Sequence, residues 1–248
     1  MPTSSEINRI KALAAEGESV NTIKDKLDLP KSTVYYQFKK EVGQKQRENQ
    51  LQIPMDEEVR GEICGVFAGD GNFYEDKNYK YRVKFTLNIK DEYWRELAAF
   101  LEKNFSKEPR VNHQEDYNRT NLRYESKKLI DFLREKLDWS EEDKTGTIRL
   151  KDLDYRRDFE IGFLRGLLDT DGFVSKKQNR VTFNSVSEDL TKDVSRILRE
   201  NQIDHEIVRD VDKRENCRDM YRARITGSEI ENLIEIIEPR HPKKRNQV

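Results

Sequence analysis

The chain has 248 residues, which is long enough for one large domain or for two or three small ones. Charged residues make up 38% of it and hydrophobic residues only 34%, yet apolar residues recur periodically over most of the length, which excludes a largely disordered chain. The net charge of −1, from 47 basic and 48 acidic residues, means that any surface for nucleic acid must arise from local separation of charge.

The first 44 residues are predicted to form three short helices. Ile10 and Ala14 mark the apolar face of the first helix, Ser19 is placed to cap the second, and Pro30 precedes the third. In that third helix, PKSTVYYQFKKE, Val34 and Phe38 lie four residues apart as a buried pair. The segment GESVNTIKDKLDLPKSTVYY resembles the helix-turn-helix of many prokaryotic regulators and recombinases.

This resemblance implies that the third helix enters the major groove of DNA. A three-helix bundle with a solvated basic helix is the alternative interpretation. We predict a helix-turn-helix domain over residues 1–44 and a polar linker over residues 45–54. The residues expected to face the groove are Lys31, Ser32, Thr33, Tyr35 and Tyr36, with Lys39 and Lys40 on phosphates.

The rest of the chain contains an internal repeat. The first copy is predicted as a helix (56–69), a strand pair ending in YKYRVKFTLNI, a helix (91–104), strands near 109–115 and 120–126, and a helix ending near 137. The second copy has a helix (155–170), strands through VSKKQNRVTFNSV, a helix (188–201), strands DHEIVRDV and RDMYRARITG, and a helix (228–237). We therefore predict an α+β fold, in which duplicated αββαββα halves (55–144 and 145–248) form a pseudo-twofold, saddle-shaped antiparallel sheet after an all-α domain.

The opening helices of the two copies end in ICGVFAGDG (63–71) and LRGLLDTDG (164–172). Small residues four apart on each helix leave a smooth stripe, so the two helices can pack closely. This packing would bring Asp70 and Asp171 together, although a helix C-terminus disfavours an anion by ~0.3–1 kcal/mol and like charges repel. Divalent cations would relieve the conflict, and carboxylate oxygens suit Mg²⁺. The alternative is that each Asp-Gly only ends its helix and the glycines serve packing alone.

Both segments resemble the motif that names the LAGLIDADG homing endonuclease family, in its two-motif, single-chain form. The second segment matches at every defining position, whereas the first keeps Gly65, Asp70 and Gly71 but has Ala68 where the motif has its earlier acid. The resemblance covers residues 56 to about 245 and implies a site-specific endonuclease that cleaves double-stranded DNA with Mg²⁺ at Asp70 and Asp171.

Further site residues follow from the same resemblance. Asn88 and Asn184 occupy the place where the family positions a polar side chain beside the metal ions. A lysine near the end of a repeat can line the active site of the family, which makes Lys243 or Lys244 a candidate helper, although a solvated basic tail is the simpler interpretation. Asp169 is interpreted as a polar contact at the end of its helix.

The strands are expected to supply the surface that binds DNA. Along YRVKFTLN, Val83, Phe85 and Leu87 alternate with polar residues, so the apolar set packs on the helices and the polar set faces outward. Arginine and lysine on such a face suit guanine and phosphate. The predicted contacts are Arg82, Lys84 and Thr86 in the first copy and Arg180, Thr182, Arg222 and Arg224 in the second.

Two other functions fit the same scaffold. One is a transcription regulator that binds DNA without cutting it, and the other is a maturase that assists RNA splicing. In each case we expect no membrane contact, because no apolar run approaches the ~20 residues of a membrane span. Since the duplication supplies two half-sites, we expect a monomer without an obligate protein partner. We expect it in the cytoplasm, associated with the nucleoid if the host is prokaryotic.

Overall fold

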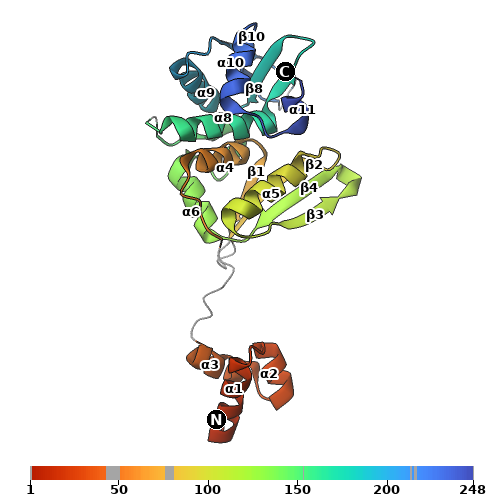
Figure 1. The fold of residues 1–248 in the computed structure, drawn as a ribbon, viewed down its shortest axis with the longest axis vertical. Coiled ribbons are helices and arrows are strands. Elements are labelled where there is room, and N and C mark those ends of the chain that lie inside the picture. The colour runs from red at the N-terminus through yellow and green to blue at the C-terminus, as the bar shows by residue number, and fades with distance from the viewer. Residues whose placement is uncertain are drawn as a thin grey trace. The chain divides into compact units, whose positions relative to one another are not determined.

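The computed structural model describes residues 2–42, 51–75, 81–152, 154–212, 214 and 217–247. The chain divides into two compact units, Met1–Gln50 and Leu51–Val248, whose elements are labelled in Figure 1. Most of the predicted linker, residues 45–50, lies outside the described residues. Within the described parts of the chain, every helix is too short or too polar to cross a lipid bilayer.

The N-terminal unit consists of three helices, α1 (Ser4–Ala15), α2 (Val20–Leu27) and α3 (Lys31–Val42). The side chain of Ser19 accepts the N–H of Thr22 and so caps α2, as predicted. Asp28, in the left-handed region at φ 52°, ends α2, and Pro30 follows two residues later. The three helices enclose a small core of their own, formed by Ile10, Ala14, Ile23, Val34 and Phe38.

The second unit has the predicted duplication. Its first half contains α4 (Glu57–Asp70), β1 (Gly71–Glu75), β2 (Tyr81–Asn88), α5 (Tyr93–Phe105), β3 (Arg110–Gln114), the single-turn helix η1 (Glu115–Tyr117), β4 (Arg119–Tyr124) and α6 (Lys127–Lys136). Its second half contains α8 (Arg157–Asp171), β7 (Phe173–Ser175), β8 (Arg180–Ser185), α9 (Glu188–Glu200), β9 (Glu206–Asp210), β10 (Met220–Thr226) and α10 (Glu229–Ile237). The α+β fold of two αββαββα halves is therefore confirmed.

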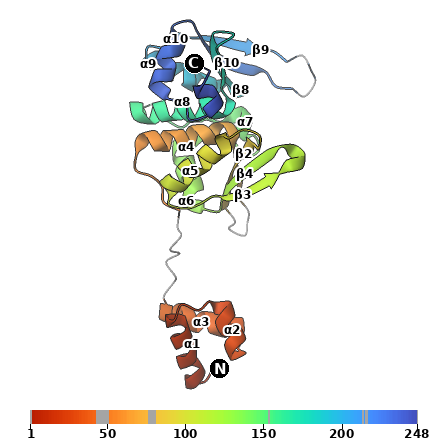
Figure 2. The same ribbon diagram turned by 45° about the vertical axis from the view of Figure 1, so that its right-hand side comes forward.

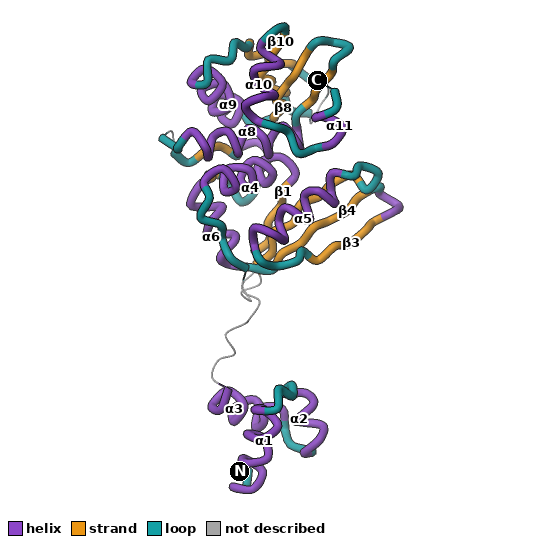
Figure 3. The backbone as a smooth tube through the Cα atoms, in the orientation of Figure 1, coloured by secondary structure: helices purple, strands orange, loops and turns teal. Residues whose placement is uncertain are grey.

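Short additional elements join the halves and end the chain. β5 (Leu137–Asp138) pairs with β6 (Arg149–Leu150), and the one-turn helix α7 (Lys144–Thr147) lies between them. A second short helix, α11 (Pro242–Arg245), follows α10. The predicted saddle is divided into two four-stranded antiparallel sheets, one in each half, with the equivalent orders β1-β2-β4-β3 and β7-β8-β10-β9. Figure 3 shows the strands of each half grouped on its own side of the α4 and α8 pair.

The two halves meet through α4 and α8, which lie side by side in Figures 1 and 2. Four glycines make this contact possible. A Cβ atom added at Gly65 would overlap the backbone oxygen of Phe163, and one added at Gly166 would overlap that of Glu62. Gly61 and Gly162 lie one turn earlier and meet backbone oxygens in the same way. The two helix backbones are thus in direct contact, and no larger residue fits at these four positions.

Charged side chains are buried beside this glycine contact. The Glu62 side chain is 1% exposed, and its Oε2 accepts a hydrogen bond of 3.2 Å from Arg165 Nη1 of the other helix. Arg165 also donates from Nε to the backbone oxygen of Ile237 at 2.5 Å. Because a buried charge without a partner is costly, this pair fixes the register of α4 against α8.

We expect Gly65→Ala or Gly166→Ala to lower the free energy of unfolding by at least about 1–3 kcal/mol, because the added methyl group overlaps a backbone oxygen that no side-chain rotation can move. Chemical denaturation measures the change. Gly69→Ala is the matched comparison, since its Cβ would meet the Thr170 side chain rather than backbone. Equal stability of Gly65→Ala and wild type would contradict the direct backbone contact.

Candidate active site and nucleic-acid interface

The two predicted metal-binding carboxylates lie at the ends of the packed helices. Asp70 is the last residue of α4, and Asp171 is the last residue of α8. A Cβ atom added at Gly69 would lie 3.3 Å from the carboxyl carbon of Asp171, so the two C-terminal ends are adjacent. The glycine contact therefore brings both acids to one place, as the sequence predicted.

Two lysines approach the same helix ends. Lys144 of α7 donates from Nζ to the backbone oxygen of Ala68 at 3.0 Å. Lys244 of α11 donates to the backbone oxygens of Leu168 at 2.6 Å, Asp169 at 2.9 Å and Thr170 at 3.2 Å. Each lysine thus occupies the unpaired carbonyl groups of a helix C-terminus, where a cation is stabilised. Lys244 was predicted as a candidate helper; Lys144 was not predicted.

Burial and mutual charge shift the titration of this cluster. Burial, and then the negative charge of Asp171, raise the pKa of Asp70 to about 7. Asp171 is a solvent-exposed residue, but the atoms packed around its carboxylate partly desolvate it and raise its pKa, opposed by the positive charges of Lys144 and Lys244. Burial lowers the pKa of each lysine to about 8. The attraction of Asp171 and Asp70 opposes this shift at Lys144, and at Lys244 the attraction of Asp169 opposes it most strongly. The site thus holds one acid and two lysines with pKa values close to neutral pH, together with a second acid whose pKa is raised.

The segment that carries Lys244 is fixed to both helices. The backbone N–H groups of Arg240 and His241 donate to the Asp169 carboxylate at 2.9 and 3.1 Å, as expected for a polar contact at the helix end. The Arg240 side chain donates to Glu62 at 2.6 and 3.0 Å, and the His241 ring stacks on Tyr93 with centroids 4.8 Å apart. His241 and Lys244 are therefore folded against the site, whereas Lys243 and Arg245 are exposed, so the interpretation as a solvated tail holds only for part of this segment.

The two predicted asparagines differ in their placement. Asn184 of β8 donates from Nδ2 to the backbone oxygen of Asp171 at 2.9 Å, and its Oδ1 is buried without a hydrogen-bond partner. Asn88, in contrast, is exposed at the end of β2, where its Oδ1 accepts the N–H of Lys90. Asn72 and Phe173 correspond, because each directly follows the Asp-Gly step of its half. Asn72 opposes Lys84 and Phe173 opposes Thr182 in the strand register, so Lys84 corresponds to Thr182. Two residues later on the same strands, Thr86 therefore corresponds to Asn184. The predicted alignment of Asn88 with Asn184 is thus wrong by two residues.

The oxygen atoms at the helix ends are suited to a hard divalent cation. Among the described residues, no three Asp, Glu, His or Cys side chains are grouped as a metal site. Asp70 and Asp171 provide two carboxylates, and the unpaired Oδ1 of Asn184 lies next to the Asp171 backbone. Mg²⁺ commonly binds through one or two carboxylates and completes its shell with water and phosphate oxygens. The residues present therefore fit a divalent cation whose remaining ligands are water or phosphate oxygens.

One face of the first sheet is polar and basic. Residues opposite one another in the register share a face, which places the predicted contacts Arg82, Lys84 and Thr86 away from the core. No strand position on this face carries an acid among the described residues of the sheet. Further outward residues, which were not predicted, are Asn72, Arg110, Asn112, Gln114, Arg119 and Arg123, whereas Asn121 lies on the same face but is 6% exposed.

The equivalent face of the second sheet carries Arg180, Arg222 and Arg224, as predicted. Thr182 lies on this face but is 3% exposed, since Phe173 and Arg224 flank it on the neighbouring strands. The structure thus does not present Thr182 for a DNA contact. Two acids of β9 are paired with the arginines: Glu206 accepts from Arg224 at 2.9 Å, and Asp210 contacts Arg222.

In the N-terminal unit, the predicted DNA contacts lie on the outside of α3. Tyr35 and Tyr36 are 55% and 59% exposed, whereas Val34 and Phe38 point into the core. The Lys40 ammonium lies 5.2 Å from the centre of the Tyr36 ring. Exposed positions also include Lys31, Ser32 and Lys39, and Thr33 is partly buried.

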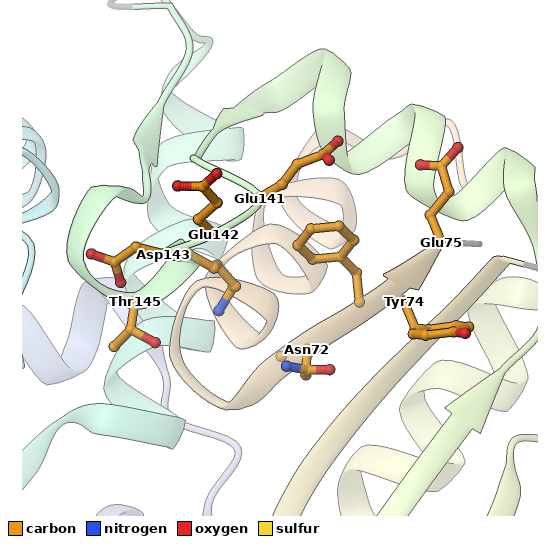
Figure 4. Close-up of a pocket in the computed structure, with 10 residues that line it drawn as sticks. Asn72, Tyr74, Glu75, Glu141, Glu142, Asp143 and Thr145 are labelled. Atoms are coloured by element: carbon orange, nitrogen blue, oxygen red, sulfur yellow. The ribbon is translucent and has the colours of Figure 1, made fainter. Parts of the chain in front are cut away.

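A cavity of about 420 Å³ adjoins Lys144 (Figure 4). Its walls are β1 and residues 141–145, including the acids Glu75, Glu141 and Asp143. Arg134 pairs with Glu75 and Glu141 at 3.4 and 2.7 Å, and Arg218 donates to both oxygens of Asp143 at 2.6 and 2.7 Å. These contacts place arginines beside three of the acids in the cavity wall.

The sequence of the second half matches a known family. The model of the LAGLIDADG-like domain matches residues 158–238. Residues 158–238 therefore carry a LAGLIDADG-like domain. No curated protein sequence matches the chain closely enough to count as a relative.

Solved structures share the LAGLIDADG fold with this chain. Mesophilic variants of the homing endonuclease I-DmoI match with a TM-score of 0.55 and 20% identity, covering 73% of this chain and 95% of I-DmoI. I-DmoI in complex with DNA and Ca matches at 0.52 and 21%, covering 73% and 88%. Full-length DUF199/WhiA from Thermatoga maritima matches at 0.51 and 16%, covering 79% and 60%. At these identities, the matches establish the fold.

The internal repeat of the sequence contains the signal for Lys144. The two Asp-Gly steps lie 101 residues apart, and Lys144 precedes Lys244 by 100 residues. Because the predicted boundary between the copies lies between residues 144 and 145, the prediction makes Lys144 the last residue of the first copy and gives it no role. Aligning the ends of the two copies, as well as their helices, would have identified it.

The charge balance at the C-terminal ends of α4 and α8 predicts an effect of pH on the stability of the protein. The folded protein binds more protons than the unfolded chain between about pH 4 and pH 7, because the pKa of Asp70 rises from 3.8 to about 7. The stability that the protonated Asp70 side chain contributes is therefore lost as pH rises through this window. At about pH 8 without divalent metal, we expect Asp70→Asn to be more stable than wild type, on the order of 1–3 kcal/mol.

Thermal unfolding at several pH values measures this effect. The difference in stability between Asp70→Asn and wild type should shrink toward about pH 4, where the Asp70 carboxyl of the folded wild type is also neutral. The control Asp131→Asn, at a side chain 60% exposed, should follow wild type at every pH. A destabilised Asp70→Asn variant at alkaline pH would contradict the repulsion between the two carboxylates.

Proposed function

We propose that this protein is a site-specific endonuclease that hydrolyses phosphodiester bonds in both strands of duplex DNA, with divalent cations, Mg²⁺ in particular, bound at Asp70 and Asp171. The observation that carries the proposal is the meeting of two carboxylates and two lysines at the C-terminal ends of α4 and α8. A helix C-terminus disfavours anions, so two acids placed there are costly for folding alone. Their presence is best explained by a cationic ligand.

The comparisons support this assignment of the site. I-DmoI is a homing endonuclease that shares the fold, and its structures include complexes with target DNA in the presence of Mn or Mg. This chain keeps an aspartate at the end of both LAGLIDADG helices. A regulator that binds DNA without cleavage would need neither acid, and its helices could end in neutral residues.

In this proposal each group of the site has a separate task. Asp70 and Asp171 hold the cations, which, when bound, neutralise phosphate charge and favour the attack of water on phosphorus. Lys144 and Lys244 place positive charge beside the scissile phosphates, and their lowered pKa values, about 8, allow exchange of a proton near neutral pH. Asn184 orients polar groups beside Asp171. The outward strand residues bind and orient the duplex in the major groove.

We further propose that α3 of the N-terminal unit binds DNA as a second module, joined to the first by a linker. The N-terminal unit has a core and capping contacts of its own, and the outward face of α3 carries lysines and tyrosines. A tethered module raises total affinity through effective concentration. Double-stranded DNA is thus the proposed partner, bound by a monomer.

The first test separates binding from cleavage. We expect Asp70→Asn or Asp171→Asn to reduce cleavage at least about 100-fold, since each removes a cation-binding charge at the reacting phosphate. Affinity for DNA should stay within about threefold of wild type, because the strand contacts are made by other residues. The substrate is a library of duplex sites incubated with and without Mg²⁺, with binding and cutting scored separately.

Asp131→Asn serves as the control, since it makes the same chemical change at an exposed position of α6. Wild type in chelator should bind DNA without cutting it. Cleavage by Asp70→Asn at the wild-type rate, or robust cutting in chelator, would contradict the proposed mechanism. If the protein binds specific DNA sites but cleaves none of them with any divalent metal, the result would support the alternative function, a transcription regulator that binds DNA without cutting it.

The second test removes the N-terminal module. Deletion of residues 1–44 should leave a folded protein that still cuts, because the second unit has its own core. The footprint should retract at one end of the site, and the salt dependence of binding should become shallower, since Lys31, Lys39 and Lys40 no longer displace counterions. An unchanged footprint and salt slope would show that these helices do not touch DNA.

A further inference from the structure

The outward faces of the two sheets differ in charge at equivalent positions. Because both sheets have the same strand order, their cross-strand rows can be matched. In the first sheet, Lys84 opposes Arg123, which opposes Arg110. In the second sheet, the matching row is Thr182, Arg224 and Glu206. One row thus has three cations, and the other has a neutral residue, a cation and an anion.

The first row holds an excess of positive charge. Like charges directly opposite on neighbouring strands destabilise a sheet. A single acid beyond the end of β4, Glu125, lies 2.8 Å from Arg123 and 3.7 Å from Arg110, and also 3.9 Å from Arg82. One carboxylate shared among three arginines leaves most of their charge uncompensated. This row is therefore suited to the phosphates of DNA, which it attracts whatever the base sequence.

The second row is compensated in the protein itself. Arg224 Nη1 donates to Glu206 Oε1 at 2.9 Å, and the next outward arginine of β10, Arg222, contacts Asp210 in the same way. Both carboxylates remain partly exposed, at 58% for Glu206 and 44% for Asp210. An acid on this face repels phosphate and so weakens general attraction to DNA. It accepts readily, however, from the amino group of cytosine, while a held arginine donates to guanine.

We propose that the two sheets divide the recognition of DNA between them, an inference that rests on the proposed binding of duplex DNA. The first sheet holds the duplex mainly by charge, through Lys84, Arg123 and Arg110. The second sheet reads base sequence, with Glu206 and Arg224 as specificity-determining residues for G·C base pairs in its half-site. Asp210 and Arg222 form a second pair of the same kind. In the second sheet, the carboxylates produce specificity because they disfavour a base that cannot donate a hydrogen bond to them. They also repel phosphate and so lower the affinity for DNA of any sequence.

Substitutions that exchange charge between matched positions of the two sheets test the proposed division of DNA recognition. The full-length chain is assayed without divalent metal, so that binding is measured without cleavage. Two probes are used: a duplex library with a randomised central segment for selection, and one fixed duplex of unrelated sequence for salt titration. The variants are Glu206→Gln, Glu206→Arg and the reciprocal Arg110→Glu, with Asp210→Asn as a second test of the acid pairs. Glu229→Gln, at a partly exposed acid of α10, is the control for net charge.

We expect Glu206→Gln to bind the unrelated duplex about 3–10-fold more tightly at low salt and to lose preference at one or two base pairs of the selected site. Glu206→Arg should also steepen the slope of log affinity against log salt concentration by about the amount expected for one additional phosphate contact. Arg110→Glu should weaken binding to every sequence alike and keep the selected preference. Glu229→Gln should change neither quantity.

Two results would overturn the inference. One is an unchanged base preference in both Glu206→Gln and Asp210→Asn, and the other is a position-specific loss of preference in Arg110→Glu. Thermal unfolding of each variant shows that these changes are not effects of misfolding. Failure of wild type to bind either probe would contradict the proposed function itself, which distinguishes that outcome from failure of the division between sheets.

Discussion

The direct contact between the backbones of α4 and α8 is the constraint on which the rest of the second unit depends. Four glycines allow it, and each meets a backbone oxygen of the opposite helix. Since the helices run side by side to adjacent C-terminal ends, this contact fixes where Asp70 and Asp171 meet. Both sheets and their covering helices are arranged around this axis, so the fold positions the acids before any ligand binds.

The ends of these helices concentrate charge that the fold alone does not require. Burial and the neighbouring acid raise the pKa of Asp70 to about 7, while two partly buried lysines with pKa values of about 8 offset part of the repulsion. The segment that brings Lys244 to the site is fixed by Asp169 on α8 and by Glu62 on α4. The second-half lysine thus depends on both helices, and the site is assembled only when the two halves have packed.

Much of the fold and the centre of the site could be predicted from the sequence, and the reasons for the errors are physical. Helix and strand periods, together with the repeated Asp-Gly steps, were sufficient to place the two halves and both acids. Lys144 was missed because it lies in a one-turn helix without a periodic pattern. Asn88 was aligned by its distance to the next helix, whereas strand register makes Thr86 the equivalent of Asn184. The burial of Thr182 depends on neighbouring strands, which local sequence does not specify.

The location of the bound cation tests the central claim most directly. Crystals of the full-length protein with duplex DNA and Mn²⁺ would reveal the ion by its anomalous scattering. The account predicts a peak between the carboxylates of Asp70 and Asp171, within about 2.0–2.4 Å of their oxygens and also bound to a phosphate oxygen of the DNA. Mn²⁺ bound only elsewhere, or DNA bound with no ion at these two acids, would contradict it.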